Sequence, residues 1–100
     1  MLLFFVYILE CSDGSYYTGH TVDIDARISS HKLGTIKQCY TYIRRPIKVA
    51  YVEEFPTRDE AFGAERQIKG WCRRKKQALI NGEFYLLKYL SNNNHKKYLI

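Results

Sequence analysis

The stretch from residue 2 to residue 20 reads LLFFVYILECSDGSYYTGH, and it predicts a β-hairpin. Residues 2–10 are apolar on both alternating faces, which is typical of a central strand covered on both sides. Ser12-Asp13-Gly14 is a turn signal, and residues 15–20 have the composition of a second strand. The hairpin therefore forms the centre of the expected sheet.

The register of this hairpin decides whether two tyrosines can share a site. A two-residue turn would put Tyr7 and Tyr17 on opposite faces, because side chains alternate along a strand. A three-residue turn over 12–14 places Tyr17 opposite Leu9 and Gly19 opposite Tyr7. We predict the three-residue turn, so that both phenols share a face and Gly19 leaves space beside the Tyr7 ring.

The rest of the chain predicts helices around one further strand. The first expected helix covers 22–33. The capping-box pattern Thr57–Glu60 predicts the start of a second helix, which runs to about Arg73, and shorter helices are expected at 75–81 and 83–91. A third strand is expected at 47–55, with Ile47, Val49 and Tyr51 alternating against Lys48 and Ala50. The predicted fold class is α+β: a small, three-stranded, mainly antiparallel sheet flanked by helices. Residues 1–91 are expected to form one domain, and 92–100 a polar C-terminal tail.

Composition favours a polyanionic partner. The 100 residues include 16 Lys and Arg against 10 Asp and Glu, for a net charge of +6. Such a balance suits nucleic acid, although a basic but inert protein would have it too. The three cysteines form no metal-binding cluster, which argues against zinc and for reduced thiols in the cytoplasm. The first apolar run lacks the features of a signal peptide and is too short to cross a bilayer.

Two polar residues of the first helix could contact phosphate. Arg27 and His31 are four positions apart and so lie on one side of the helix. A guanidinium at the edge of the core suits bidentate phosphate contact, and an imidazole can bind phosphate or transfer a proton. The alternative is a surface arginine and a histidine favoured by the helix dipole.

Glu65 is a carboxylate on an apolar helix face. Its neighbours at helical spacing are Ala61, Ala64, Ile68 and Cys72. A carboxylate on a buried face needs a partner charge or a metal ion. The alternative is an i,i+4 ion pair with Lys69, but we favour Glu65 as a ligand of Mg²⁺ or Mn²⁺, with water completing the coordination.

A run of basic residues at 66–76 surrounds Trp71 and contains no acid. Such runs are usually solvated faces, but this one could hold a nucleic-acid backbone. The candidate contacts, with two from earlier in the chain, are Lys32, Arg44, Lys69, Arg73, Arg74 and Lys75.

In order along the chain, Tyr7, Tyr17-Thr18-Gly19, Arg27, His31 and Glu65 resemble the motifs of the GIY-YIG nuclease superfamily, in particular its small single-domain bacterial branch (UPF0213-like). The resemblance covers roughly residues 4–82. It implies five catalytic side chains: Tyr7, Tyr17, Arg27, His31 and Glu65. It also implies that Glu65 binds the metal and that Gly19 is the motif glycine. Many larger members use a further asparagine; Asn81 is a candidate, or only a helix cap. Phe5 stands where the first motif has glycine.

By this resemblance the protein is a metal-dependent DNA endonuclease using Mg²⁺ or Mn²⁺. Without a second domain it has little surface for reading sequence, and exposed aromatic residues suit unpaired bases. We therefore expect single-stranded or branched DNA as substrate, in repair or recombination. The alternatives are a non-catalytic nucleic-acid-binding module and an interaction protein that uses its aromatic residues. The oligomeric state is left open.

Overall fold

A computed structural model describes the backbone of residues 2–97 and the side chains of residues 2–91. The chain divides after Lys69 into two compact units. The first contains the sheet, two α-helices and the 3₁₀-helix η1 (Tyr42–Arg44), and the second contains two further α-helices. The single domain over 1–91 with a separate tail stays a prediction.

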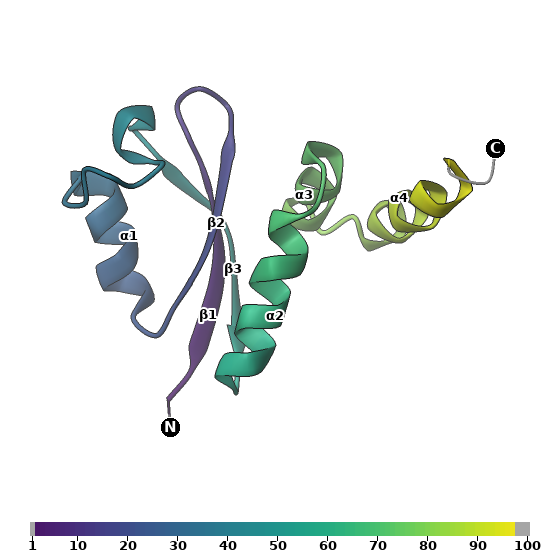
Figure 1. Cartoon of the computed structure of the whole chain (residues 1–100), viewed down its shortest axis with the longest axis horizontal. Helices are drawn as coiled ribbons and strands as arrows, with labels where there is room; N and C mark the ends of the chain where they lie inside the picture. The colour runs from purple at the N-terminus through teal and green to yellow at the C-terminus, as the bar shows by residue number, and fades with distance from the viewer. Residues whose placement is uncertain (1, 98–100) are drawn as a thin grey trace. The chain divides into compact units, whose positions relative to one another are not determined.

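The first unit is built on a three-stranded sheet whose order is β2-β1-β3. Its strands are β1 (Phe4–Glu10), β2 (Tyr16–Thr21) and β3 (Lys48–Phe55), and both neighbouring pairs are antiparallel. Figure 1 shows this sheet with helices on its two sides. The predicted fold class, α+β with a small antiparallel sheet, is confirmed.

The hairpin has the predicted register. Tyr7 pairs with Gly19, and Leu9 pairs with Tyr17. The turn closes through a hydrogen bond from the backbone N–H of Gly14 to the carbonyl of Cys11 at 2.9 Å. Gly14 has φ 84°, a left-handed conformation that glycine adopts without the steric cost of a Cβ. The three-residue turn therefore places both tyrosines on one face.

The predicted alternation along β3 is wrong at one point. Ile8 pairs with Tyr51 but Leu9 pairs with Val49, so Ala50 is an extra residue in a β-bulge. Because Ile8 and Leu9 point to opposite faces of β1, Val49 and Tyr51 also lie on opposite faces rather than together.

Helices α1 (Ile24–Leu33) and α2 (Arg58–Lys69) cover opposite faces of the sheet (Figure 1). The carboxylate of Asp23 caps α1 by accepting from the backbone N–H of Ala26 at 3.1 Å. Thr57 caps α2, because its Oγ1 accepts from the backbone N–H of Glu60 at 3.2 Å, as the capping-box pattern predicts.

Helix α2 ends earlier than predicted. Its last residue is Lys69, and Gly70 follows, a residue that favours a helix end. Cys72 is therefore not on the apolar face of α2; it is exposed and occupies the N-cap position of the next helix. The prediction that Cys72 neighbours Glu65 along this face is wrong.

The second unit consists of α3 (Arg73–Ile80) and α4 (Phe84–Lys97), which pack against each other. Gly82, with φ 71°, lies in the tight turn between them. The backbone of α4 continues beyond the predicted end at residue 91, and residues 98–100 of the predicted tail lie outside the described residues. Among the described residues, no helix has the length and apolar character needed to cross a membrane.

Candidate active site

The Tyr7 ring packs directly against the backbone of Gly19. Tyr7 is fully buried, and its ring centroid lies 6.4 Å from that of Tyr17. A Cβ atom added to Gly19 would lie 2.5 Å from the Tyr7 hydroxyl oxygen and 2.7 Å from its Cζ. Glycine is therefore needed here because of the close approach of the ring, as the register argument predicted.

A chain of polar contacts extends from Tyr7 into the loop after α1. The Tyr7 hydroxyl lies 3.0 Å from His31 Nε2, and His31 Nδ1 lies 2.7 Å from Thr41 Oγ1. Thr41 Oγ1 in turn donates to Cys39 Sγ at 3.5 Å. Since the Thr41 hydroxyl has one hydrogen, it must accept from His31 Nδ1–H. Nε2 is then the acceptor for the hydroxyl proton of Tyr7.

Burial keeps the side chains of Tyr7 and His31 neutral at physiological pH. Burial, and then the neighbouring Tyr17, raise the pKa of Tyr7 well above its usual 10.0. Burial, and then the positive charge of Arg27, lower the pKa of His31 below 6.5. At neutral pH the imidazole is therefore uncharged and can accept a proton on Nε2.

The Cys39 thiol is the last side chain in this series of polar contacts from Tyr7. Its burial alone would raise its pKa, but hydrogen bonds from the Thr41 hydroxyl and backbone, and then from the Tyr17 hydroxyl, lower the pKa below the usual 9.0. The sulfur accepts the hydrogen bond of the Thr41 hydroxyl at 3.5 Å and so helps to fix that hydroxyl.

Arg27 provides a positive charge that acts on several members of this cluster. Its side chain is on the exposed part of α1. Its charge partly offsets the rise that burial causes in the pKa of Tyr7 and Tyr17, and it adds to the lowering of the pKa of His31. The structure therefore brings together four of the predicted residues, Tyr7, Tyr17, Arg27 and His31.

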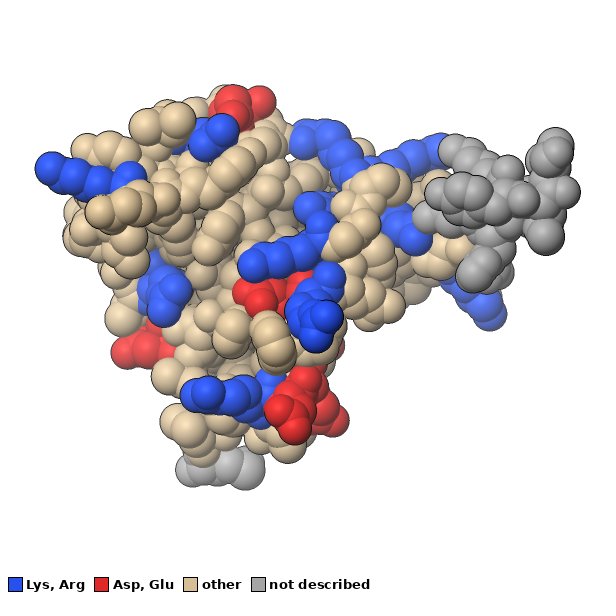
Figure 2. All heavy atoms as spheres, viewed as in Figure 1, with Lys and Arg blue, Asp and Glu red and all other residues tan. Residues whose placement is uncertain are grey.

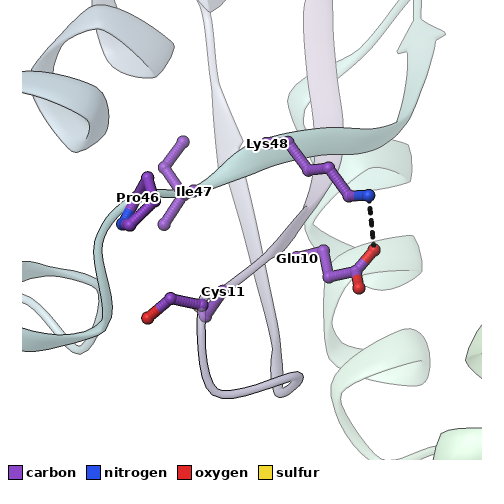
Figure 3. A pocket seen from close by; sticks show the side chains of 6 residues that line it. Glu10, Cys11, Pro46, Ile47 and Lys48 are labelled. Carbon is purple, nitrogen blue, oxygen red and sulfur yellow. Dashed lines mark ion pairs between the residues drawn. The ribbon is translucent and has the colours of Figure 1, made fainter.

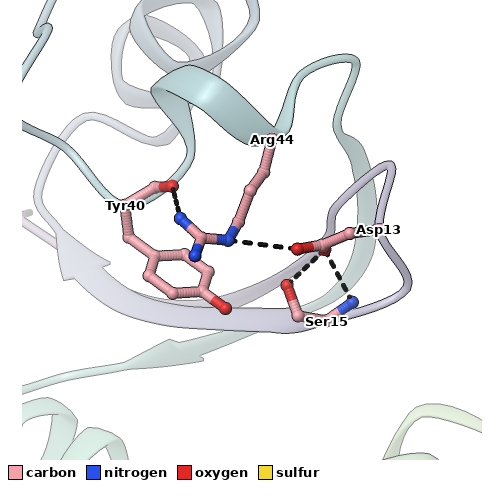
Figure 4. Close-up of polar contacts among 4 residues, drawn as sticks. All are labelled: Asp13, Ser15, Tyr40 and Arg44. Atoms are coloured by element: carbon pink, nitrogen blue, oxygen red, sulfur yellow. Dashed lines mark hydrogen bonds and ion pairs between the residues drawn. The ribbon is translucent and has the colours of Figure 1, made fainter.

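Tyr17 is supported on its outer side by Tyr40 and Arg44. The Tyr17 and Tyr40 rings are stacked, with centroids 6.1 Å apart and planes at 20°. The Arg44 guanidinium covers the Tyr40 ring at 3.8 Å from its centroid. Its Nε donates to Asp13 Oδ2 at 3.1 Å and a terminal nitrogen donates to the Tyr40 carbonyl at 2.9 Å (Figure 4). Arg44, predicted as a nucleic-acid contact, has these donors engaged within the protein.

Glu65 approaches from the opposite face of the sheet, on α2. Only 6% of the residue is exposed, as the sequence predicted for a carboxylate on the apolar face. Its Oε2 lies 3.0 Å from His20 Nδ1 and 3.6 Å from Lys69 Nζ. The expected alternative partner Lys69 is thus present, and His20 is an unexpected second one. The charge of Glu65 also contributes to raising the pKa of Tyr17, so the carboxylate lies within electrostatic reach of the tyrosine cluster.

The described side chains offer few ligands for a metal ion. Within this part of the chain, no group of three or more His, Cys, Asp or Glu residues is arranged to hold one. A Mg²⁺ site does not need such a group, because this ion commonly keeps several waters and uses one or two carboxylates. Glu65, a buried carboxylate next to the partly exposed His20, fits that kind of site.

Apart from Arg44, which ends the 3₁₀-helix η1 (Tyr42–Arg44), the predicted nucleic-acid contacts lie on three α-helices. Lys32 is exposed on α1, and Lys69 is half-exposed in the last turn of α2. Figure 2 shows basic side chains over α2 next to an acidic group. The others, in the second unit, are in the first turn of α3: Arg73, Arg74 and Lys75.

Two predicted residues of the second unit have clear structural partners. Lys75 is buried, and its Nζ lies 6.0 Å from the centre of the Trp71 ring. Asn81 is the C-cap of α3 and donates from Nδ2 to Glu83 Oε1 at 3.2 Å. The cap interpretation of Asn81 accounts for its position.

A pocket of about 260 Å³ opens at the other end of the hairpin (Figure 3). It is lined by Glu10, Cys11, Ser12, Pro46, Ile47 and Lys48, none of them a predicted site residue. Glu10 and Lys48 form an ion pair there at 3.6 Å. Two of its lining residues, Cys11 and Ile47, belong to the same apolar core cluster as Tyr7, against which Tyr17 packs.

Sequence reasoning missed four side chains of the site: His20, Cys39, Tyr40 and Thr41. A signal existed for His20, because alternation along β2 puts it on the face opposite Tyr17, which is the face covered by α2. The other three belong to an irregular loop whose path no periodic pattern predicts.

The GIY-YIG catalytic domain family matches residues 3–78. A UPF0213 protein of Staphylococcus aureus is 46% identical over 76 residues, which are 76% of this chain and 92% of that protein. The solution NMR structure of a UPF0213 protein from Bacillus halodurans is 42% identical, with a TM-score of 0.54, and the match covers 80% of this chain and 84% of that one. A solution NMR structure from E. faecalis is 34% identical with a TM-score of 0.59, covering 86% and 90%.

The family match, the relatives and the arrangement of the motif residues agree. The UPF0213 name specifies no substrate, but GIY-YIG domains are nuclease domains that generally require a divalent metal and act on DNA. This chain belongs to the GIY-YIG catalytic domain family.

Proposed function

We propose that the protein is a metal-dependent DNA endonuclease whose catalytic residues are Tyr7, Tyr17, Arg27, His31 and Glu65. The observation that carries the proposal is the 3.0 Å contact between the Tyr7 hydroxyl and a neutral His31, beside Arg27. A buried phenol whose proton points at a histidine nitrogen is an arrangement for proton transfer rather than for packing alone.

The role of Tyr7 follows from its hydrogen bond. With its pKa raised by burial, the phenol stays protonated at neutral pH and cannot act as a base by itself. It can instead accept a proton from the attacking water on its oxygen while it gives its own proton to His31 Nε2. His31 is then the base, and Thr41 holds it in the required tautomer through Nδ1.

Arg27 and Tyr17 act on the phosphate. A guanidinium close to both phenols is suited to neutralise charge that develops on the phosphate oxygens in the transition state. Tyr17 stays protonated because burial raises its pKa, so its hydroxyl can donate a hydrogen bond to the substrate.

Glu65 would hold the metal ion, either Mg²⁺ or Mn²⁺. When bound, the ion supplies a positive charge that stabilises the leaving oxygen. Buried Glu65 contributes a fixed negative ligand, and the half-exposed Lys69 can move away from it because its own side chain reaches solvent.

We propose single-stranded or branched DNA as the substrate, in the cytoplasm and in a repair or recombination setting. Exposed aromatic side chains favour unpaired bases, which can stack on them. Phe62 on α2 is 46% exposed, and Arg66 lies 5.6 Å from its ring centre. Trp71 is half-buried, so it contributes less surface than Phe62 to such stacking.

One observation favours the alternative of a non-catalytic nucleic-acid-binding module. His20 and Lys69 already surround the Glu65 carboxylate, which would satisfy it without a metal ion. Such a module would bind DNA equally well with Mg²⁺ or EDTA and would leave it intact.

The test uses purified protein with end-labelled single-stranded, duplex and branched DNA and with single-stranded RNA, each with Mg²⁺, Mn²⁺ or EDTA. We expect cutting of single-stranded or branched DNA with either metal and none with EDTA. Binding without cutting of every substrate would support the non-catalytic module instead.

A further inference from the structure

His20 lies next to Glu65 at ion-pair distance but without the geometry of a hydrogen bond. Its Nδ1 lies 3.0 Å from Glu65 Oε2, but the geometry is not that of a hydrogen bond, and this buried atom has no other hydrogen-bond partner among the described residues. Buried polar atoms are nearly always hydrogen-bonded, so a buried nitrogen that faces a carboxylate without a hydrogen bond is a candidate ligand for a cation.

We propose that His20 Nδ1 and Glu65 Oε2 are two protein ligands of one divalent cation, and that the imidazole makes the site prefer Mn²⁺ to Mg²⁺. This deepens the proposed function, since it rests on a metal ion at Glu65. Imidazole nitrogen binds transition metals well, whereas Mg²⁺ prefers oxygen ligands.

The distance between the two donor atoms fits this role. Ligand atoms at about 2.1 Å from an ion and at right angles to each other are about 3 Å apart. That is the separation found between Nδ1 and Oε2. In such a pair each donor atom points at the ion rather than at the other donor, which is compatible with the lack of hydrogen-bond geometry.

The His20 ring is held on one side and is partly open to solvent, although its Nδ1 is buried. The Phe62 ring lies 5.7 Å from the imidazole, centre to centre, and fixes one side of it. The His20 side chain is 39% exposed, so solvent reaches the ring. Lys69 Nζ, at 3.6 Å from the same carboxylate oxygen, is the positive charge that a bound ion would displace.

Metal binding without DNA tests the inference. The free Mn²⁺ signal in electron paramagnetic resonance gives the Mn²⁺ affinity of the full chain, and competition by Mg²⁺ gives the Mg²⁺ affinity. We expect His20→Ala to weaken Mn²⁺ binding about tenfold or more while changing Mg²⁺ binding little. Glu65→Gln should weaken both, and Lys69→Met, the control, should strengthen both because it removes a competing charge.

The outcomes separate the two proposals. If Glu65→Gln abolishes binding but His20→Ala binds Mn²⁺ like the wild type, the metal site stands and His20 is not a ligand. If neither variant changes Mn²⁺ affinity, the metal assignment of the proposed function fails together with this inference. Circular dichroism of His20→Ala, a half-exposed position, checks that the fold is retained.

Discussion

Replacing Gly19 by alanine should damage the site through Tyr7 alone. The new Cβ would lie 2.5 Å from the Tyr7 hydroxyl oxygen, 2.7 Å from Cζ and 3.2 Å from Cε1. Ordinary contacts between such atoms are about 3.5–4.0 Å, so the ring must move by roughly 1 Å. Tyr7 is fully buried and cannot swing into solvent. Overpacking of this kind costs about 1–3 kcal/mol, or roughly 4–24 °C in melting temperature for a domain of this size.

The same displacement should disable the proton path. A shift of about 1 Å stretches the 3.0 Å contact between Tyr7 and His31 beyond hydrogen-bonding distance, and misplacement on this scale can cost about 10²-fold in rate. The assays are thermal unfolding and the single-turnover rate of DNA cutting below the melting temperature. Gly63→Ala is the matched control: nothing lies within 4 Å of its Cβ, and it should stabilise α2 by about 0.5–1 kcal/mol. Wild-type stability and cutting in Gly19→Ala would refute the reasoning.

Three further predictions concern the groups around Tyr7. The folded-state pKa of His31 should lie below 6.5 in an NMR titration and should rise in Arg27→Gln, and a wild-type pKa above 6.5 would contradict this. The stabilisation that comes from neutral His31 is complete above pH 6.5 and is lost as the pH falls through the folded-state pKa. Thr41→Val should lower the free energy of unfolding by about 1–3 kcal/mol in urea, because it leaves the buried His31 Nδ1–H with only the weak acceptor Cys39 Sγ, 3.7 Å away; an unchanged midpoint would show that the bond at 2.7 Å contributes nothing. Arg44→Met should slow cutting several-fold and leave DNA affinity unchanged, since Arg44 supports Tyr40 and Tyr17; a loss of affinity with an unchanged maximal rate would instead make Arg44 a DNA contact.

The sheet could be predicted from the sequence because its patterns are local. Apolar residues on both faces of β1 and a turn ending in Gly14 are enough to define the hairpin, and the register then follows from the turn length. That register placed Gly19 beside Tyr7 without any knowledge of the rest of the chain.

The failures lie where tertiary contacts decide. The bulge at Ala50 depends on how β3 pairs with β1, and no residue type within β3 predicts it. Thr41 is fully buried and contacts His31 Nδ1. This contact joins a loop residue to α1, so it can be identified only in the folded chain. For Glu65, burial was predictable from helix periodicity, but its contact with His20 required both the strand alternation and the packing of α2 on the sheet.

The central claim is that Tyr7 and Glu65, from opposite faces of the sheet, serve one phosphodiester-cleaving site. The most direct measurement is the single-turnover cutting of labelled single-stranded and branched DNA in Mn²⁺ by the wild type, Tyr7→Phe and Glu65→Gln, with DNA affinity measured in parallel. The account predicts that each variant binds DNA like the wild type and loses cutting by about 10²-fold or more. Cutting at the wild-type rate by either variant would contradict it.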